Sequence, residues 1–534
     1  MNDLNRRVAE IIGYHERTKH RFDGYAKGPS TIDWEAQPDL FRRYDGCDEI
    51  LLPLAADELR TTYAELDRQR QEPAEWTLHR IGQLLEISLG LSAWKQYGSS
   101  RWSLRCNPSS GNLHPTEAYL IVSGIAELED GVYHYRADRH ALELRCRFTT
   151  DRPATQATLL LGFSSVHWRE AWKYGERAYR YCQLDVGHAV AAISFAAATL
   201  GECIQPLPHT DDTQTAQLLG IDRDKEFHPH EHEHPDLLLS LIPDTPSDLG
   251  PLIERALQGR WYGRANLLDA HHHYEWPVID VVAESARRPA AIATPQHTFA
   301  TLPPLPSIDT AETAAWLFRQ RRSAQAFDGE TALPATAFFR MLDRVLPRPG
   351  LAPWDSLPWT PRIHLVLFVH RVSGLAPGLY MLTRSDNAVA ALRASTRSEF
   401  TWEEVADAPA HLPLRRLLGA RAERTAARLS CLQEIAGASA FSLGMLAEFE
   451  PQLQEAPWRY RELYWEAGAI GQVLYLEAEA HGMRGTGIGC FFDDAVHELL
   501  GITDRHWQSL YHFTVGTPLV DQRIITLPPY SNER

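Results

Sequence analysis

The sequence predicts an α+β fold that occurs twice in one chain. Residues 179–221 align with residues 460–502 at a constant offset of 281 positions without a gap, and ten of the 43 aligned pairs are identical. The halves also begin alike, because the pattern of residues 17–24 recurs in residues 322–329 at an offset of 305. Both halves mix short apolar strand patterns with long helical patterns, which is typical of helices packed on a sheet. We therefore expect two related domains.

Residue patterns predict the main elements in chain order. Apolar residues at helical spacing predict a helix over residues 78–91, and a short apolar run predicts a strand over 118–122. In each repeat an apolar helix is followed by a glycine, which is common just past a helix end. These repeats predict helices over 184–200 and 465–481, and closing core strands over 237–242 and 510–515.

The length of the chain and one change in composition set the domain division. A chain of 534 residues is too long for one core and suits two domains of about 250 residues each. Residues 283–306 contain five prolines and many alanines without helical periodicity, as expected for a linker. We predict a first domain over residues 1–282, this linker, and a second domain over residues 307–534.

Charge and composition exclude several classes of protein. The net charge of −16 argues against a sequence-blind nucleic-acid binder, and no apolar run approaches the ~20 residues of a membrane span. Seven scattered cysteines, without a Cys-x-x-Cys pair, fit a reducing compartment. We expect a globular cytoplasmic protein without membrane or nucleic-acid partners.

Several motifs together resemble the flavin nitroreductase superfamily. They are Arg321-Arg322-Ser323, the loop from Pro108 to Pro115, and the glycine-rich segment from Gly482 to Asp494. The segments 14–20 and 173–181 are similar to one branch, the SagB-type dehydrogenases, some of which oxidise peptide thiazolines or oxazolines to azoles. The resemblance implies two nitroreductase-like domains, each a central mixed sheet flanked by helices, which form an intramolecular pseudo-dimer.

The resemblance implies FMN as the cofactor, with its phosphate held mainly by the second half. Guanidinium groups at a helix start would suit a phosphate or the O2 carbonyl of the ring, because free N–H groups add positive charge there. These roles fall on Arg321, Arg322 and Ser323, with Arg523 as a second phosphate contact. Gln325 would donate a hydrogen bond to the ring edge.

The halves differ where the flavin N5 is expected to receive a backbone N–H. Gly489 and Cys490 both carry a donor, whereas the first half has Pro208 in the equivalent turn and Glu16 in place of Arg321. The superfamily loop reaches across a dimer interface, so Pro108, Ser109, Ser110 and Asn112 would complete the site of the second half. We therefore predict one FMN per chain.

Lys173 and Tyr174 match the pair that azole-forming members place near the flavin to remove a proton. Lysine serves as a base only if its pKa falls, and Arg177 or Arg180 is a candidate cause. A surface helix remains the alternative for this pair. The alternate histidines of residues 228–234 could bind zinc or nickel, but the flanking prolines favour an exposed loop with adventitious metal binding, and we assign no metal ligands there.

The function that follows is an FMN-dependent oxidoreductase that dehydrogenates a heterocycle or C–N bond in a peptide or small metabolite by hydride transfer to N5. Oxygen would reoxidise the flavin. The alternatives are an NAD(P)H-dependent nitro- or quinone-type reductase and a non-catalytic flavin-binding scaffold of a peptide-modifying complex. The sequence leaves open the substrate and whether the pseudo-dimer is monomeric in solution.

Overall fold

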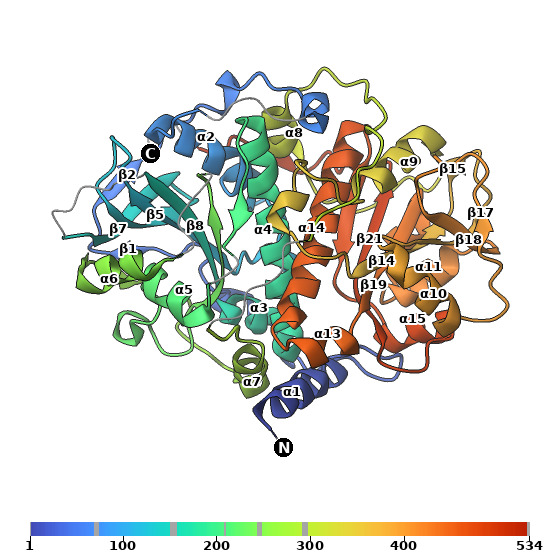
Figure 1. Cartoon of the computed structure of the whole chain (residues 1–534), viewed down its shortest axis with the longest axis horizontal. Helices are drawn as coiled ribbons and strands as arrows, with labels where there is room; N and C mark the ends of the chain where they lie inside the picture. Colours follow the sequence, from blue (N-terminus) through green and yellow to red (C-terminus); the bar gives the residue numbers. More distant parts are fainter. Residues whose placement is uncertain are drawn as a thin grey trace.

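Two sheets, one in each half of the chain, dominate the computed structural model (Figure 1). The structure describes residues 2–68, 74–149, 157–207, 210–242, 248–290 and 297–530. The first sheet has the order β11 (Arg260–Trp261), β7 (Ala141–Arg147), β6 (Gly131–Arg136), β5 (Thr116–Ser123), β8 (Thr158–Ser165), β10 (His234–Ser240) and β9 (Gln205–Pro206), and β2 (Glu49–Leu51) also pairs with β7. The second has the order β17 (Glu403–Glu404), β18 (Leu414–Gly419), β16 (Gly378–Leu382), β14 (Ile363–Val369), β19 (Phe441–Glu448), β21 (Trp507–Gly516) and β20 (Arg484–Ile488). Because the two orders correspond from edge to edge, the tandem α+β fold is confirmed.

The ladders between these named strands are antiparallel, and a parallel pairing enters at one edge. There Ser323 forms an isolated parallel bridge to Gly485 of β20. Smaller ladders join β1 (Tyr44–Asp45) to β12 (Arg264–Ala265), β13 (Leu333–Pro334) to β15 (Val372–Ser373), and β3 (Leu91–Tyr97) to both β4 (Ser100–Arg105) and β22 (Ile525–Leu527). The bridge between Ser323 and Gly485 fixes the segment that carries Arg321 to Ser323 to the edge of the second sheet.

Helices lie between and around the sheets. In the first half they are α1 (Asp3–Arg17), α2 (Leu78–Ser88), α3 (His167–Tyr174), α4 (Ala178–Thr199), α5 (Asp212–Leu219), α6 (Gly250–Gln258) and α7 (Pro277–Ser285). In the second half they are α8 (Ala314–Gln320), α9 (Ala335–Arg344), α10 (Asp386–Ser395), α11 (Glu423–Leu429), α12 (Glu434–Ala438), α13 (Glu450–Glu455), α14 (Arg459–Ala480) and α15 (Asp493–Leu500). None of the described helices is long and apolar enough to span a membrane.

The long helices α4 and α14 cross at the centre of the molecule (Figure 1). Their bounds differ by the sequence offset of 281, as do those of α5 and α15. A Cβ on Gly187 would lie 2.3 Å from the carbonyl oxygen of Trp465, and one on Gly468 would lie 2.2 Å from that of Leu184. Glycine at this repeated position therefore allows the two backbones to touch.

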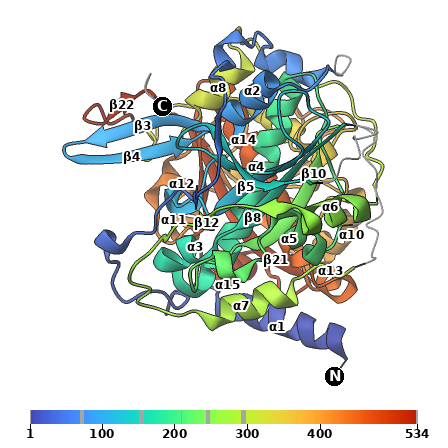
Figure 2. The same ribbon diagram turned by 90° about the vertical axis from the view of Figure 1, so that its left-hand side faces the viewer.

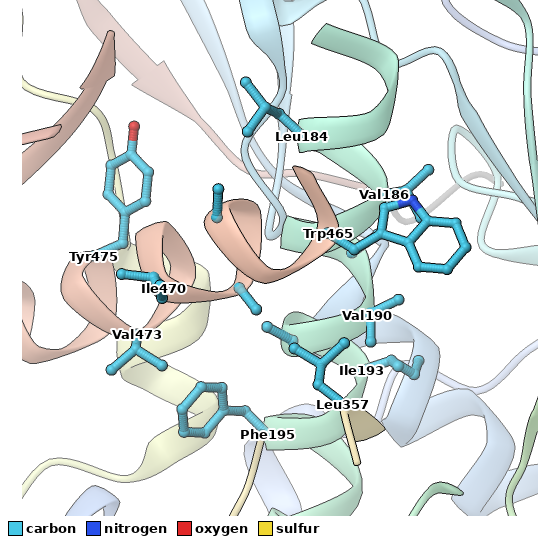
Figure 3. Packing of buried hydrophobic residues seen from close by; sticks show 14 of the residues in the cluster. Leu184, Val186, Val190, Ile193, Phe195, Leu357, Trp465, Ile470, Val473 and Tyr475 are labelled. Carbon is cyan, nitrogen blue, oxygen red and sulfur yellow. The ribbon is translucent and has the colours of Figure 1, made fainter. Parts of the chain in front are cut away.

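One buried apolar cluster continues from one half into the other around this crossing. Val190, Ile193 and Phe195 of α4 lie near Ile470 and Val473 of α14 (Figure 3). Such a helix pair, apolar on nearly all sides, needs burial by both sheets. The halves therefore form an intramolecular pseudo-dimer with a shared core, as the sequence predicts.

Two reciprocal buried ion pairs join the halves. Arg180 of α4 contacts Asp493 of α15 at 2.7 Å, and Arg461 of α14 contacts Asp212 of α5 at 2.9 Å. All four side chains are buried. Arginine and aspartate thus recur in the two repeats because each arginine neutralises an aspartate of the other half. Removal of one partner would leave the other charge buried and unpaired.

The spatial halves also exchange segments. The C-terminal strand β22 adds to the projecting β3–β4 hairpin of the first half (Figure 2). Helix α8 of the second half packs against α2 and β3. At the expected linker, α7 continues to Ser285, so residues 283–285 are helical. The apolar side of α7, with Val282 buried, extends the helix past the change in composition.

Candidate functional site

A cavity of about 520 Å³ lies between the two halves, within the roughly 300–1,000 Å³ typical of small-molecule sites. Strand β20 and the segment after α8 contribute from the second half, and α4, β3 and the loop of residues 107–112 contribute from the first. The structure brings most of the expected site residues to its wall: Pro108, Ser109, Ser110, Asn112, Tyr174, Arg321, Arg322, Ser323, Gln325, Gly489 and Cys490.

The arginine cluster follows a helix instead of starting one. Helix α8 ends at Gln320 and Arg321 is its C-cap, so the expectation that free helix N–H groups surround a phosphate is wrong. The helix dipole is negative at this end, where cations are favourable. Positive charge in this wall of the cavity therefore comes from cationic side chains and not from the start of a helix.

Arg321 is buried and only partly satisfied by the protein. Its Nε donates to the carbonyl of Cys106 at 2.9 Å and its Nη2 to that of Arg105 at 3.2 Å, while buried Nη1 has no partner among the described residues. A buried unpaired donor is costly, so this one is suited to donate to an anionic or carbonyl oxygen of a bound molecule.

Four cationic side chains surround this part of the cavity, those of Lys95, Arg321, Arg322 and Arg484. Burial, with repulsion from Arg321, lowers the pKa of Arg322 to about 10. Burial, with Arg322 and Arg484, lowers the pKa of Lys95. Glu479 is the nearby counter-charge: it accepts from the Arg322 backbone at 2.9 Å and lies 3.5 Å from Arg484. The excess of positive charge would be relieved by a phosphate dianion.

Sequence reasoning missed Lys95 and Arg484, and it placed Arg523 in the site. The side chain of Arg523 is 71% exposed and pairs with Asp521 at 2.7 Å, so the structure does not bring it to the cavity wall. Arg484 begins β20, three residues before the glycine-rich turn that the sequence did single out. The available signal was its place as a basic residue inside the glycine-rich segment from Gly482 to Asp494.

The loop of residues 108–112 is anchored to α4 through Asp185. The Ser110 N–H and Oγ both donate to an Asp185 carboxylate oxygen at 3.0 Å, and Ser109 Oγ accepts from the His114 N–H at 2.8 Å. Burial raises the pKa of Asp185 to about 7, against the hydrogen bonds of the two serines. Asp185 also lines the cavity, so it places a group that titrates near neutrality inside the site.

The turn after β20 presents backbone donors to the cavity. The Gly487 N–H donates to Tyr475 Oη at 2.9 Å. Within the described part of the chain, the N–H groups of Gly489 and Cys490 have no hydrogen-bond acceptor. Gly489 lies against Tyr181, where a Cβ would approach the ring to 2.3 Å. The tyrosine therefore requires glycine here and fixes the direction of the turn.

Lys173 and Tyr174 end α3 next to the loop. Tyr174 lines the cavity, whereas Lys173 lies behind Gly111, where an added Cβ would be 3.1 Å from Nζ. Burial lowers the pKa of Lys173, and Glu170 opposes this change. Arg177 and Arg180 are not the cause, because both are bound to Asp493. The lysine is half-buried, unlike a residue of a solvated helix face.

The pseudo-symmetric counterpart of the cavity is nearly filled. A space of about 40 Å³ lies against Pro206 and Leu207, the equivalents of Gly487 and Ile488, and Trp359 and Trp465 occupy its surroundings. Glu16 forms an ion pair with Lys19 at 2.9 Å. Pro208 and His209, which the sequence places at the disabled turn, lie outside the described residues. The two halves thus differ more than tenfold in cavity volume.

Comparison with known proteins assigns the family. The Nitroreductase family model matches residues 77–228 and 374–517, one region in each half. The chain belongs to the nitroreductase family. This is a family of flavin oxidoreductases, and the chain carries its domain in tandem.

Individual known proteins also resemble the chain. A crystal structure from Anabaena variabilis that carries the provisional name nitroreductase superposes with a TM-score of 0.69 at 23% identity, over 96% of this chain and 99% of that one. The trifolitoxin-processing protein of Rhizobium leguminosarum bv. trifolii is 28% identical over 209 residues, 34% of this chain and 56% of the relative. A provisionally named nitroreductase of Methanocaldococcus jannaschii is 29% identical over 124 residues, 21% of this chain and 63% of the relative. The chain thus covers less than two thirds of each of these two curated relatives.

The histidine-rich loop contributes to a separate cavity of about 360 Å³. His230, His232 and His234 line it together with His167, whose ring stacks on that of His234 at 4.1 Å. No group of three metal-binding side chains converges in the described residues.

Proposed function

We propose that this chain is an FMN-dependent dehydrogenase that acts on a heterocycle or C–N bond in a peptide or small metabolite. The observation that carries the proposal is one large cavity between the halves, with five cationic residues in its wall and Lys173 and Tyr174 behind and beside its loop. The unpaired Nη1 of Arg321 fits a bound oxygen, and the cationic cluster fits the phosphate of FMN.

FMN, when bound, supplies a ring that accepts a hydride. Arg321, Arg322 and Ser323 would hold its polar groups, and the N–H groups of Gly489 and Cys490 are suited to donate to N5. The loop of residues 108–112 would cover the other side from the first half. Among the described residues, one cavity lies beside the arginine cluster and its counterpart is nearly filled, which implies one FMN per chain.

Lys173 would take the proton in the dehydrogenation. As a hydride leaves the substrate carbon, the adjacent nitrogen or carbon must lose a proton, and a neutral amine can accept it. Burial favours that neutral form by lowering the pKa of Lys173. Tyr174, which lines the cavity, would position the substrate beside the amine. The name of the trifolitoxin-processing relative supports a peptide as the substrate.

The test is Lys173→Met, which keeps much of the packing volume and removes the amine. With a synthetic thiazoline dipeptide as substrate, thiazole formation should fall by the ~10²–10⁴ typical of a lost general base, while bound FMN stays constant. Reduction of the flavin by NAD(P)H needs no such base and should be unchanged. Lys225→Met, on an exposed residue far along the chain, is the matched control.

Two results would favour the alternatives. A wild-type protein that is reduced by NADPH and leaves thiazolines and oxazolines unchanged would support the nitro- or quinone-type reductase. A protein that binds FMN without reacting with either class would support the scaffold.

A further inference from the structure

Cys490 of the cavity wall has a second cysteine beside it. Cys431 follows α11, and its segment is joined to that of Cys490 by two hydrogen bonds. The Phe492 N–H donates to the Leu429 carbonyl at 2.8 Å, and Gln433 Nε2 donates to the Cys490 carbonyl at 3.2 Å. These bonds hold the two segments side by side, with Cys431 between the bonded residues of its own segment, and the Cys431 thiol forms a hydrogen bond with Cys490. Both cysteines are partly exposed.

A histidine and an arginine complete the surroundings of Cys490. His20 is held by a parallel bridge to Phe492, and its Nδ1 accepts from the Ala26 N–H at 2.9 Å. With Nδ1 occupied in this way, the other ring nitrogen is the one available to the Cys490 thiol. Arg177 Nη2 donates to the Gly489 carbonyl at 3.2 Å, which fixes a positive charge beside the turn.

These neighbours favour the thiolate of Cys490. Its hydrogen bond from the Cys431 thiol is the main cause that lowers the pKa of Cys490 to about 5, and His20 and Arg177 add to this effect while burial opposes it. The pKa of Cys431 is raised by its hydrogen bond to Cys490, by burial and by the negative charge of Cys490. One thiolate and one thiol in contact are the arrangement found in reactive cysteine pairs.

The backbone at Cys431 is also unusual. Cys431 has a φ of 52° and Leu432 a φ of 60°, so two successive residues with side chains are left-handed. Such conformations persist only where the surrounding structure imposes them. The strained turn lies between Leu429 and Gln433, the two residues that are bonded to the segment of Cys490.

We propose that Cys490 and Cys431 are a peroxide-reactive thiol pair, with Cys490 as the attacking and Cys431 as the resolving residue. The Cys490 thiolate attacks one oxygen of a hydroperoxide, the O–O bond breaks, and a sulfenic acid and a hydroxide or alkoxide form. The Cys431 sulfur then attacks Cys490 and expels water, so the S–S bond forms. Two thiols and hydrogen peroxide thus give one disulfide and two waters.

This site is independent of the proposed substrate chemistry, although it shares the cavity wall. The turn that would donate to N5 includes Cys490, so a disulfide would tie that turn to the segment after α11. Oxidation would therefore act on the same wall that lines the cavity.

The test uses the purified full chain, reduced and then treated with one equivalent of hydrogen peroxide at pH 6. Peptide mapping after alkylation should show a Cys431–Cys490 crosslink. Cys47 is the matched control: it is also partly exposed, but burial raises its pKa to about 12, and it should remain an alkylatable thiol. Without peroxide, iodoacetamide should modify Cys490 at least ~10²-fold faster than Cys47.

A second experiment separates the two roles. In Cys431→Ser, peroxide should leave a sulfenic acid on Cys490 that dimedone traps, and in Cys490→Ser the residue Cys431 should stay reduced. The proposal fails if wild-type Cys431 and Cys490 remain alkylatable after peroxide. It also fails if Cys47 reacts as fast as Cys490, a result that needs no variant.

Discussion

Arg484→Gln tests whether the cationic part of the cavity holds the FMN phosphate. Arg484 lies on β20, its side chain is 29% exposed, and its nearest counter-charge is Glu479 at 3.5 Å. The substitution removes the charge and breaks no short hydrogen bond to another described residue. It is therefore a cleaner probe than Arg321, whose guanidinium also supports two carbonyls of the first half.

The expected magnitude follows from the burial of these cations and from the repulsion between them. The pKa of Arg322 falls from 12.5 to about 10, which corresponds to about 3 kcal/mol at about 1.4 kcal/mol per pKa unit. A bound dianion would recover part of this cost. A charge-assisted hydrogen bond contributes roughly 1.5–3 kcal/mol, and partial exposure of Arg484 favours the lower value. The Kd for FMN should rise about tenfold in Arg484→Gln, and up to about a hundredfold in Arg322→Ala.

The assay is titration of FMN into apoprotein, followed by quenching of flavin fluorescence at fixed ionic strength. Arg523→Gln is the control, because it makes the same change of charge at an exposed residue paired with Asp521. Its Kd should change less than about twofold, as expected for surface ion pairs. If Arg523→Gln weakens FMN binding as much as Arg484→Gln does, the phosphate lies elsewhere and the assignment is wrong.

Three further predictions follow from the same structure. Denaturation of the purified protein should release about one equivalent of FMN per chain, because the counterpart cavity has only about 40 Å³, and two equivalents would refute the asymmetry. Fragments 1–290 and 291–534 expressed separately should be flavin-free or aggregated, because each exposes the apolar surface of the α4–α14 contact. A second fragment that is yellow from bound flavin would contradict the shared site. In the folded state Asp185 keeps its proton up to about pH 7, whereas the unfolded chain releases it near pH 4. The free energy of unfolding that this bound proton contributes is full below about pH 4 and is lost as the pH rises through about 7. In urea denaturation, the stability of Asp185→Asn relative to wild type should therefore increase by about 3 kcal/mol from pH 5 to pH 8, and a constant difference would show that Asp185 is already ionised.

Much of the architecture was determined by the sequence itself. The repeat at offset 281 predicted equivalent bounds for α4 and α14, although both helices begin six residues before the start that their apolar pattern indicated. The identical pairs at Arg180 and Asp212 record the reciprocal ion pairs, and the pair at Gly187 records the contact of the helices. Such residues repeat because the same contact is made twice.

The composition of the site was decided only in three dimensions. Asp185, Lys95 and Arg484 carry no motif, and they meet because a helix, a hairpin and a strand edge from different halves converge on one cavity. The expected helix start at Arg321 was wrong for a related reason. The Arg321 guanidinium donates to two backbone carbonyls of the first half, and these hydrogen bonds hold the residue just past the end of α8. Local patterns encode contacts within an element, whereas the charge and protonation of a buried site depend on which distant groups share its low-dielectric surroundings.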